Sequence, residues 1–247
     1  MGMPVRVDVR DGGVDPGAVE RMFAWLRFVD ATFSPYRCDS EIARLGRGEL
    51  ALRDAHPLVA EVLEHCERLR RATRGAFDAR ARGSLDPSGY VKGWSVDRAA
   101  AMLAAAGARN FCVDGGGDLV VRGGPAPGRG WRVGIRHPRR RDRVAAVLEL
   151  TDGAVATSGA YERGDHIVDP RTRRPARGVQ AVTVVGPDLA TTDACATAAF
   201  AMGEGGPAWT GRLRGYEALT IMSDDRVLST PGFDRLRPRE GQDPGGP

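Results

Sequence analysis

The stretch FCVDGGGDLVVRGGPAPGRGWRVGIR, residues 111–136, decides the fold class. It holds three segments of strand composition, separated only by turns rich in glycine and proline, at 111–114, 119–122 and 131–135. A fourth such segment follows at 145–150, again with no helical pattern before it. Strands that follow one another in this way do not form a regular βαβ alternation. The pattern predicts an α+β fold, in which helices flank a mixed or antiparallel sheet.

Helical patterns and further strands surround this region. Asp15 followed by Pro16 is typical of a helix start, and apolar residues recur after it at helical spacing. Four helices are predicted, from Pro16 through Val29, from Pro57 to near Gly75, from about Lys92 to Gly107, and over 188–202. Other strands are predicted at 5–9, where an edge strand is expected, and at 181–185, 219–222 and 226–228. We expect one domain over 1–230 and a disordered tail at 231–247, which is rich in Pro, Gly, Arg and Asp.

The composition is typical of a globular protein. Of the 247 residues, 42% are hydrophobic and 28% are charged, and no apolar stretch is long enough to cross a bilayer. The first ten residues contain no apolar signal core, so we expect a cytoplasmic protein without stable membrane insertion. The net charge of +4 favours anionic ligands such as nucleotides but is too small for a nucleic-acid-binding surface. The basic block at 136–143, RHPRRRDR, is predicted to be a solvated hairpin loop.

The cysteines and glycines lack the patterns of several common sites. The four cysteines form no CxxC or Cys/His pattern, so we expect buried, reduced thiols at Cys38, Cys66, Cys112 and Cys195. The glycines at 115–117 do not fit GxGxxG, because Val120 stands where the third glycine belongs. No Walker loop, HExxH or GxSxG motif occurs. The usual dinucleotide-binding, NTPase, protease and lipase functions therefore lose their main support.

Two side chains on the helix predicted at 188–202 can share one cation. Asp193 and Thr197 are four residues apart and lie on the same side of that helix. A carboxylate and a hydroxyl suit a hard cation such as Mg²⁺. The alternative is an exposed aspartate near a helix start and a threonine bonded to its own backbone. Alone, the pair is weak evidence for a metal site.

His166 is a candidate general base. It lies between Asp165 and the turn sequence of 167–170, IVDP, where an imidazole can exchange a proton near neutral pH beside a bound phosphate. The alternative is a turn histidine held by a neighbouring carboxylate. These two interpretations are about equally supported by the residues alone.

The segment 86–93, DPSGYVKG, opens a predicted helix. The amides of a helix N-terminus and the ammonium of Lys92 both favour an anion. The alternative is an ordinary capped helix start with a solvated lysine.

The order and spacing of these segments resemble the ApbE family of FAD:protein FMN transferases along nearly the whole chain. Residues 33–45, FSPYRCDSEIARL, are similar to the family pattern FSxY...SEIxxLN. The sequence GAFD at 75–78 is similar to the GxFD element of the family, and residues 86–99 resemble DxGgxxKGxxxDRa.

The resemblance continues through the second half of the chain. DGGGD at 114–118 resembles the nxGGD turn, and TSG at 157–159 with the segment 166–172 matches TSGxYxR...HIxDPxTG. Residues 193–197 match the DAxxT helix. Six matches in the same order are hard to attribute to chance.

The resemblance implies a domain that binds FAD and Mg²⁺. It implies FAD contacts at seven residues, which are Tyr36, Ala76, Phe77, Asp78, Asp86, Lys92 and Val168. It implies that Mg²⁺ is held by the side chains of Asp193 and Thr197 and by the backbone carbonyl of Gly89.

The resemblance also implies an activity. FMN would pass from FAD to a Ser or Thr hydroxyl of a partner flavoprotein with release of AMP, and His166 would be the base. Two alternatives stay open. Water as the acceptor would make the chain an FAD pyrophosphatase that forms FMN and AMP, and a disabled site would make it a non-catalytic FAD-binding protein.

Four features depart from the family pattern. The spacing between Asp78 and Asp86 is shorter than in typical members, so part of the pocket wall must be trimmed or supplied in another way. Gly46 stands where the family often has Asn, Asp114 replaces the usual Asn of the glycine turn, and Arg173 occupies the glycine position of DPxTG. The metal and histidine positions are unchanged, whereas the geometry around the substrate is put in doubt.

Overall fold

The computed structural model describes residues 2–140, 142–159 and 167–238. Its centre is a seven-stranded sheet in the order β1-β2-β3-β6-β9-β10-β11, in which all neighbouring strands are antiparallel. The strands are β1 Val5–Val9, β2 Phe111–Gly115, β3 Asp118–Arg122, β6 Gly153–Gly159, β9 Val179–Gly186, β10 Glu217–Met222 and β11 Val227–Ser229. Two hairpins stand apart from this sheet, β4 Trp131–Arg136 with β5 Val144–Leu150 and β7 Val168–Asp169 with β8 Arg174–Pro175.

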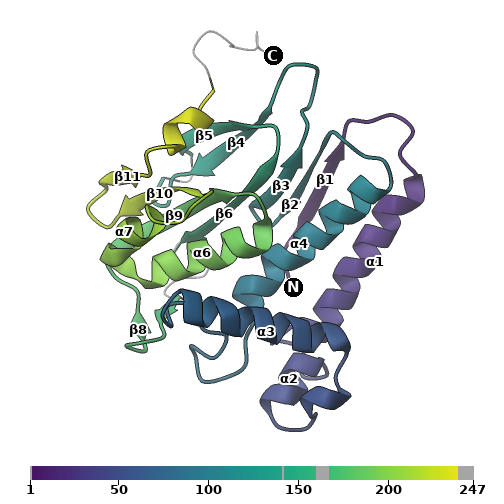
Figure 1. Cartoon of the computed structure of the whole chain (residues 1–247), viewed down its shortest axis with the longest axis vertical. Helices are drawn as coiled ribbons and strands as arrows, with labels where there is room; N and C mark the ends of the chain where they lie inside the picture. The colour runs from purple at the N-terminus through teal and green to yellow at the C-terminus, as the bar shows by residue number, and fades with distance from the viewer. Residues whose placement is uncertain (1, 141, 160–166, 239–247) are drawn as a thin grey trace.

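The helices gather on one side of the large sheet (Figure 1). They are α1 Pro16–Phe33, α2 Glu41–Gly46, α3 Pro57–Ala72, α4 Ser88–Ala105, α6 Leu189–Ala201 and α7 Gly206–Thr210. Three short 3-10 helices complete the described parts of the chain, η1 Leu52–Asp54, η2 Gly203–Gly205 and η3 Phe233–Leu236. The predicted α+β fold is confirmed. None of the helices in these parts is long and apolar enough to span a membrane.

Alternate residues of the central strands face two different layers. Val120 and Val182 belong to the core under α1, α4 and α6, whereas Val121 and Leu219 pack against the β4–β5 hairpin. This alternation follows from the two-residue period of a strand, which sends neighbouring side chains to opposite faces of the sheet. The β4–β5 hairpin therefore covers the face that the helices leave open. Its connection coincides with the basic block at 136–143, which confirms the predicted hairpin loop.

Helices α4 and α6 touch through their backbones. A Cβ atom added to Gly93 of α4 would lie only 2.3 Å from the carbonyl oxygen of Leu189 at the start of α6. Asp97, one turn further along α4, accepts hydrogen bonds from the amides of Leu189 and Ala190 at 2.9 and 2.7 Å. These amides belong to the first turn of α6 and have no partner within that helix. The start of α6 is thus fixed to α4 by shape and by hydrogen bonds.

Strand β6 was not predicted from the sequence, although it is the middle strand of the sheet. Its residues are almost all buried, so it shows no alternation of apolar and polar side chains. Its sequence, GAVATSG, also consists of small residues with little strand propensity apart from Val155 and Thr157. Both signals on which a strand prediction rests were therefore weak.

The C-terminal segment differs from the predicted tail in its first residues. Disorder was predicted from Pro231, but Phe233–Leu236 forms η3, and the side chain of Phe233 is fully buried in the core under the β4–β5 hairpin. The many polar residues around Phe233 favoured a prediction of disorder, although this one apolar side chain packs into the core. Residues 239–247 of the predicted tail lie outside the described residues.

The prediction of four buried thiols is confirmed for two of them. Cys66 and Cys195 are buried and Cys112 is half-buried, but Cys38 is exposed. Burial raises the pKa of the Cys66, Cys112 and Cys195 thiols to about 12, because a thiolate is poorly solvated in the interior. These three thiols are unreactive at neutral pH, since the thiolate is the reacting form.

One fast-reacting thiol is expected in the native protein. At pH 8 a disulfide reagent such as DTNB should label Cys38 rapidly, because roughly one in 10⁴ of the other thiols is ionised at that pH. Counting the thiols released in native and denatured protein checks this. Cys38→Ser should abolish the fast phase, and a second fast thiol in that variant would contradict the assignment.

The backbone contact between α4 and α6 predicts the effect of adding one methyl group. Gly93→Ala should lower the free energy of unfolding by about 2 kcal/mol or more, since two packed helices must move apart. Gly12→Ala is the matched control, because no heavy atom lies within 4 Å of its added Cβ. Urea denaturation of both variants measures the difference. Equal midpoints would show that the two helices can separate without cost.

Candidate functional site

A cavity of about 550 Å³ opens at the N-terminal end of α4. Its lining residues fall within 33–36, 76–86, 88–92, 157–158 and 167–170, together with Met3 and with Asp193, Thr197 and Ala201 of α6. Parts of the chain that are far apart in the sequence therefore meet around one space. A volume of this size suits a nucleotide-sized ligand.

All the predicted site residues that the structure describes line this cavity. They are Tyr36, Ala76, Phe77, Asp78, Asp86, Gly89, Lys92, Val168, Asp193 and Thr197. His166 lies outside the described residues, although the two residues that follow it, Ile167 and Val168, are part of the wall. The structure thus brings the predicted residues together, while their roles as ligands of FAD and Mg²⁺ stay predictions.

Oxygen atoms gather at one corner of the cavity. Asp193 is 2% exposed, and its Oδ2 atom accepts the Gly93 amide at 3.1 Å. The hydroxyl of Thr197 lies 3.3 Å from that of Ser158 on β6. Gly89 lies beside Thr197, since a Cβ atom added to it would be 3.6 Å from the Thr197 hydroxyl. The predicted metal-binding residues are therefore neighbours.

This donor set fits a hard divalent cation. Its groups are a carboxylate, two hydroxyls and the main chain of Gly89, and oxygen ligands are what Mg²⁺ prefers. Within the described ranges no three His, Cys, Asp or Glu side chains form a cluster that could hold a metal. A cation here would complete its coordination with water and ligand oxygens, as Mg²⁺ usually does at phosphate sites.

Lys92 lies between two buried carboxylates. Its Nζ atom is 2.5 Å from Oδ2 of Asp118 and 3.6 Å from Oδ1 of Asp193. Asp118 is only 1% exposed, and its Oδ1 atom accepts the Thr157 amide at 2.9 Å. The sequence analysis singled out Asp118 only as the last residue of the glycine turn. The position of this acidic residue between a glycine run and an apolar strand was the one feature of the sequence that could have indicated a role for it.

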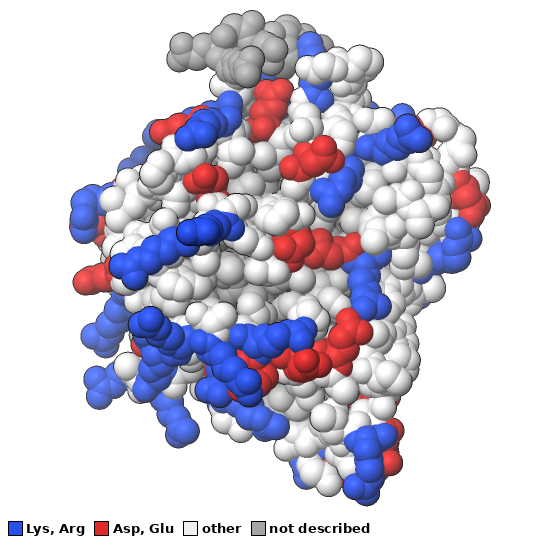
Figure 2. Space-filling model, viewed as in Figure 1, with Lys and Arg blue, Asp and Glu red and all other residues white. Residues whose placement is uncertain are grey.

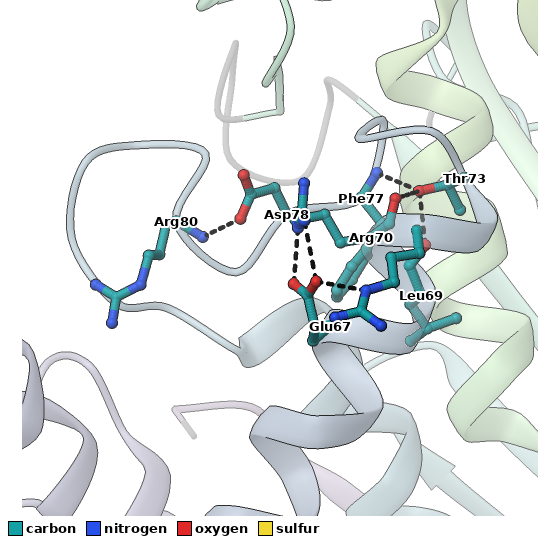
Figure 3. Close-up of polar contacts among 8 residues, drawn as sticks. Glu67, Leu69, Arg70, Thr73, Phe77, Asp78 and Arg80 are labelled. Carbon is teal, nitrogen blue, oxygen red and sulfur yellow. Dashed lines mark hydrogen bonds and ion pairs between the residues drawn. The ribbon is translucent and has the colours of Figure 1, made fainter. Parts of the chain in front are cut away.

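Phe77 and Tyr36, two of the aromatic residues that line the cavity, differ in their exposure. Phe77 is 3% exposed, whereas Tyr36 is 72% exposed. The Phe77 amide donates to the hydroxyl of Thr73 at 2.9 Å, and this hydroxyl donates in turn to the carbonyl of Leu69 at 2.8 Å (Figure 3). The segment carrying Phe77 is thereby tied to the last turn of α3. The part of the cavity wall at Phe77 is therefore fixed to α3, whereas the ring of Tyr36 is exposed to solvent.

The shortened segment between Asp78 and Asp86 forms a closed loop. The Asp86 amide donates to the carbonyl of Ala79 at 2.7 Å, and the Asp86 carboxylate accepts the Ser88 amide at 3.0 Å, just where α4 begins. The Asp78 carboxylate accepts the Arg80 amide at 2.8 Å (Figure 3). Ala81 and Arg82 within this loop line the cavity. The loop therefore supplies part of the cavity wall.

Arg173 adopts the backbone conformation that the glycine of the family motif would favour. Its φ angle is +57°, in the left-handed region, and its amide donates to the carbonyl of Asp169 at 2.7 Å across the β7–β8 turn. A side chain in this region costs about 1 kcal/mol relative to glycine. Asp169 also pairs with Arg171, and hydrogen bonds from that guanidinium lower the pKa of the Asp169 carboxyl. The turn beside Val168 thus keeps its shape without a glycine.

Charges of both signs alternate over the surface that carries the helices. Figure 2 shows basic side chains interspersed with acidic ones over the upper part of this face, while basic side chains predominate toward its lower left. Several of them form ion pairs, such as Glu67 with Arg70 and Arg71 on α3. This mixed surface agrees with the small net charge of +4.

Comparison with known proteins identifies the family. The model of the ApbE family matches residues 1–83 and 79–220. The chain belongs to the ApbE family. The two matched parts meet at 79–83, inside the shortened loop. An FAD:protein FMN transferase from Rhodobacter capsulatus is 33% identical in an alignment 241 positions long that covers 94% of this chain and 43% of that protein. One from Treponema pallidum is 35% identical in an alignment 179 positions long that covers 64% of this chain and 49% of the relative.

Solved structures of the ApbE family share the fold. The flavin transferase ApbE from Vibrio cholerae superposes with a TM-score of 0.82 at 25% identity, and 96% of each chain is covered. An ApbE protein from Thermotoga maritima gives a TM-score of 0.85 at 24% identity and shows the same fold over 96% of this chain and 97% of its own. The chain spans less than half the length of the two curated relatives named above.

Proposed function

We propose that this ApbE-family chain transfers FMN from FAD to a Ser or Thr hydroxyl of a partner flavoprotein and releases AMP. The observation that carries the proposal is the convergence of ten predicted residues on one nucleotide-sized cavity. The names of the relatives, FAD:protein FMN transferase and flavin transferase, support the same activity.

The described residues suggest how FAD would lie in the cavity. Tyr36 and Phe77 offer aromatic rings to the planar parts of FAD. Lys92 and the N-terminal amides of α4 favour its phosphates. Gly89, Asp193 and Thr197 would hold Mg²⁺, which when bound neutralises charge on the pyrophosphate. The reacting bond is thereby expected near the meeting point of α4 and α6.

The transfer itself would be a displacement at phosphorus. The acceptor oxygen forms a bond to the FMN phosphorus, and the bond from that phosphorus to the AMP oxygen breaks. His166 takes the proton of the acceptor hydroxyl. Lys92 stabilises the negative charge that develops on the transferred phosphate. FMN remains attached to the acceptor by a phosphoester, and AMP leaves.

The exposed ring of Tyr36 predicts a loss of FAD affinity without a loss of stability. Tyr36→Ala should weaken FAD binding about 3- to 10-fold, the usual worth of one aromatic contact, and Tyr36→Phe should bind as the wild type does. Fluorescence titration with FAD measures both variants. Leu52→Ala, which removes another exposed apolar side chain that does not line the cavity, is the control. Unchanged affinity in Tyr36→Ala would exclude ring contact with FAD.

Single substitutions should separate the metal site from the base. Asp193→Ala should abolish the Mg²⁺-dependent release of AMP, because it removes the only carboxylate among the proposed ligands. His166→Ala should keep FAD affinity and slow transfer about 100-fold, the scale of a lost general base. Full transfer by His166→Ala would remove this residue from the mechanism.

The acceptor is tested in the same assay. Mass spectrometry of candidate flavoproteins after incubation with FAD and Mg²⁺ should find covalent FMN on Ser or Thr. If AMP and FMN form at the same rate with and without a Ser/Thr acceptor peptide, and no adduct appears, water is the acceptor and the chain is a pyrophosphatase. Binding of FAD without AMP release would indicate a non-catalytic flavin-binding protein.

A further inference from the structure

The ammonium of Lys92 can interact with two carboxylates, and the structure places it unequally between them. It lies 2.5 Å from Asp118 and 3.6 Å from Asp193. Asp193 belongs to the proposed metal site, whereas Asp118 does not line the cavity. The lysine therefore forms its short contact with the carboxylate that has no proposed role in binding.

A cation bound at Asp193 would compete with Lys92. Both positive charges are attracted to the same carboxylate, and the ammonium also repels a nearby cation. Asp193 is buried, so these charges are weakly screened by solvent and by salt. If Lys92 paired closely with Asp193, a divalent cation would have to displace it. The position of the ammonium thus controls how available the Asp193 carboxylate is.

Asp118 is built to keep that ammonium in place. It begins β3 directly after the glycine turn, and its Oδ1 atom is fixed by the Thr157 amide of the neighbouring strand β6. Its side chain is almost fully buried, so it cannot turn toward solvent. Lys92 lies in the first turns of α4 and reaches Asp118 from the helix layer. A carboxylate fixed by the sheet therefore holds a flexible side chain of the helix layer.

We propose that Asp118 is a positioning residue that holds the Lys92 ammonium away from Asp193 and so keeps the Asp193 carboxylate available to a divalent cation. The inference rests on the metal site of the proposed function. It concerns an interaction between two residues of this chain, and its effect should appear as metal affinity before any transfer takes place.

A double-mutant cycle with Mn²⁺ as the probe tests the role of Asp118. Electron paramagnetic resonance counts free Mn²⁺ in titrations of the wild type, Asp118→Asn, Lys92→Met and the double variant, each with and without FAD. Asparagine keeps the shape and the acceptor for the Thr157 amide but loses the charge. Asp118→Asn should weaken Mn²⁺ binding by about 10-fold or more, the usual scale for a residue that supports a metal ligand. In the Lys92→Met background the same substitution should change the affinity by less than about threefold, because the competing ammonium is absent.

A matched control lies on the same β2–β3 hairpin. Asp114→Asn makes the same change of charge four residues away, at a carboxylate that accepts the Gly117 amide, so the Mn²⁺ affinity should be unchanged. Lys92→Met alone provides a second test should Asp118→Asn fold poorly, since it should bind Mn²⁺ at least as tightly as the wild type. Circular dichroism and the urea midpoint of each variant show whether it is folded.

Three results would overturn the inference. The first is an unchanged Mn²⁺ affinity in folded Asp118→Asn. The second is an equal loss of Mn²⁺ affinity on Asp118→Asn in the wild-type and in the Lys92→Met backgrounds. This result would mean that Asp118 acts through its own charge. The third is weaker binding by Lys92→Met. If the wild type binds no Mn²⁺ with or without FAD, the proposed metal site itself is wrong. This outcome differs from one in which Mn²⁺ binds but the double-mutant cycle shows no coupling between Asp118 and Lys92.

Discussion

The close approach of α4 and α6 is the constraint on which the rest of the structure depends. Gly93 allows the approach because its missing side chain leaves room for the carbonyl of Leu189. Two carboxylates then join the helices. Asp97 of α4 accepts hydrogen bonds from the first amides of α6, and Asp193 of α6 accepts one from the Gly93 amide. Burial raises the pKa of the Asp97 carboxyl, while the hydrogen bonds from the Leu189 and Ala190 amides act in the opposite direction.

The same junction builds the site. Gly93 follows Lys92 in the chain, so the backbone contact with α6 also places the ammonium between Asp193 and Asp118 of the sheet layer, closer to Asp118. Asp193 serves both purposes, because one oxygen bonds to the backbone of α4 while the other faces Lys92. A change that loosens the helix pair would therefore move the proposed metal ligands as well. The contact between α4 and α6 and the proposed metal site therefore depend on the same residue, Asp193.

Local signals predicted much of this arrangement from the sequence. Asp15 before Pro16 and the proline at 57 marked the true starts of α1 and α3, and the alternation in 5–9 marked the edge strand β1. The order of the family motifs predicted that the candidate residues lie in one site, whereas no rule of local structure predicted this. The pairing of Asp118 with Lys92 was not predictable, since it joins a strand and a helix through side-chain geometry alone. The only indication of the positive φ of Arg173 was the glycine position that it occupies in the family motif, since an arginine itself gives no sign of it.

The loop between Asp78 and Asp86 builds its part of the cavity wall from few residues. Its two ends are fixed independently, one by Thr73 at the end of α3 and the other by Asp86 at the start of α4. The hydrogen bond from the Asp86 amide to Ala79 closes the loop between them, so few residues are needed to span the gap. Closing a short loop also costs less entropy than closing a long one. The wall contains Arg82, and this places a cationic side chain at the edge of a cavity suited to an anionic ligand.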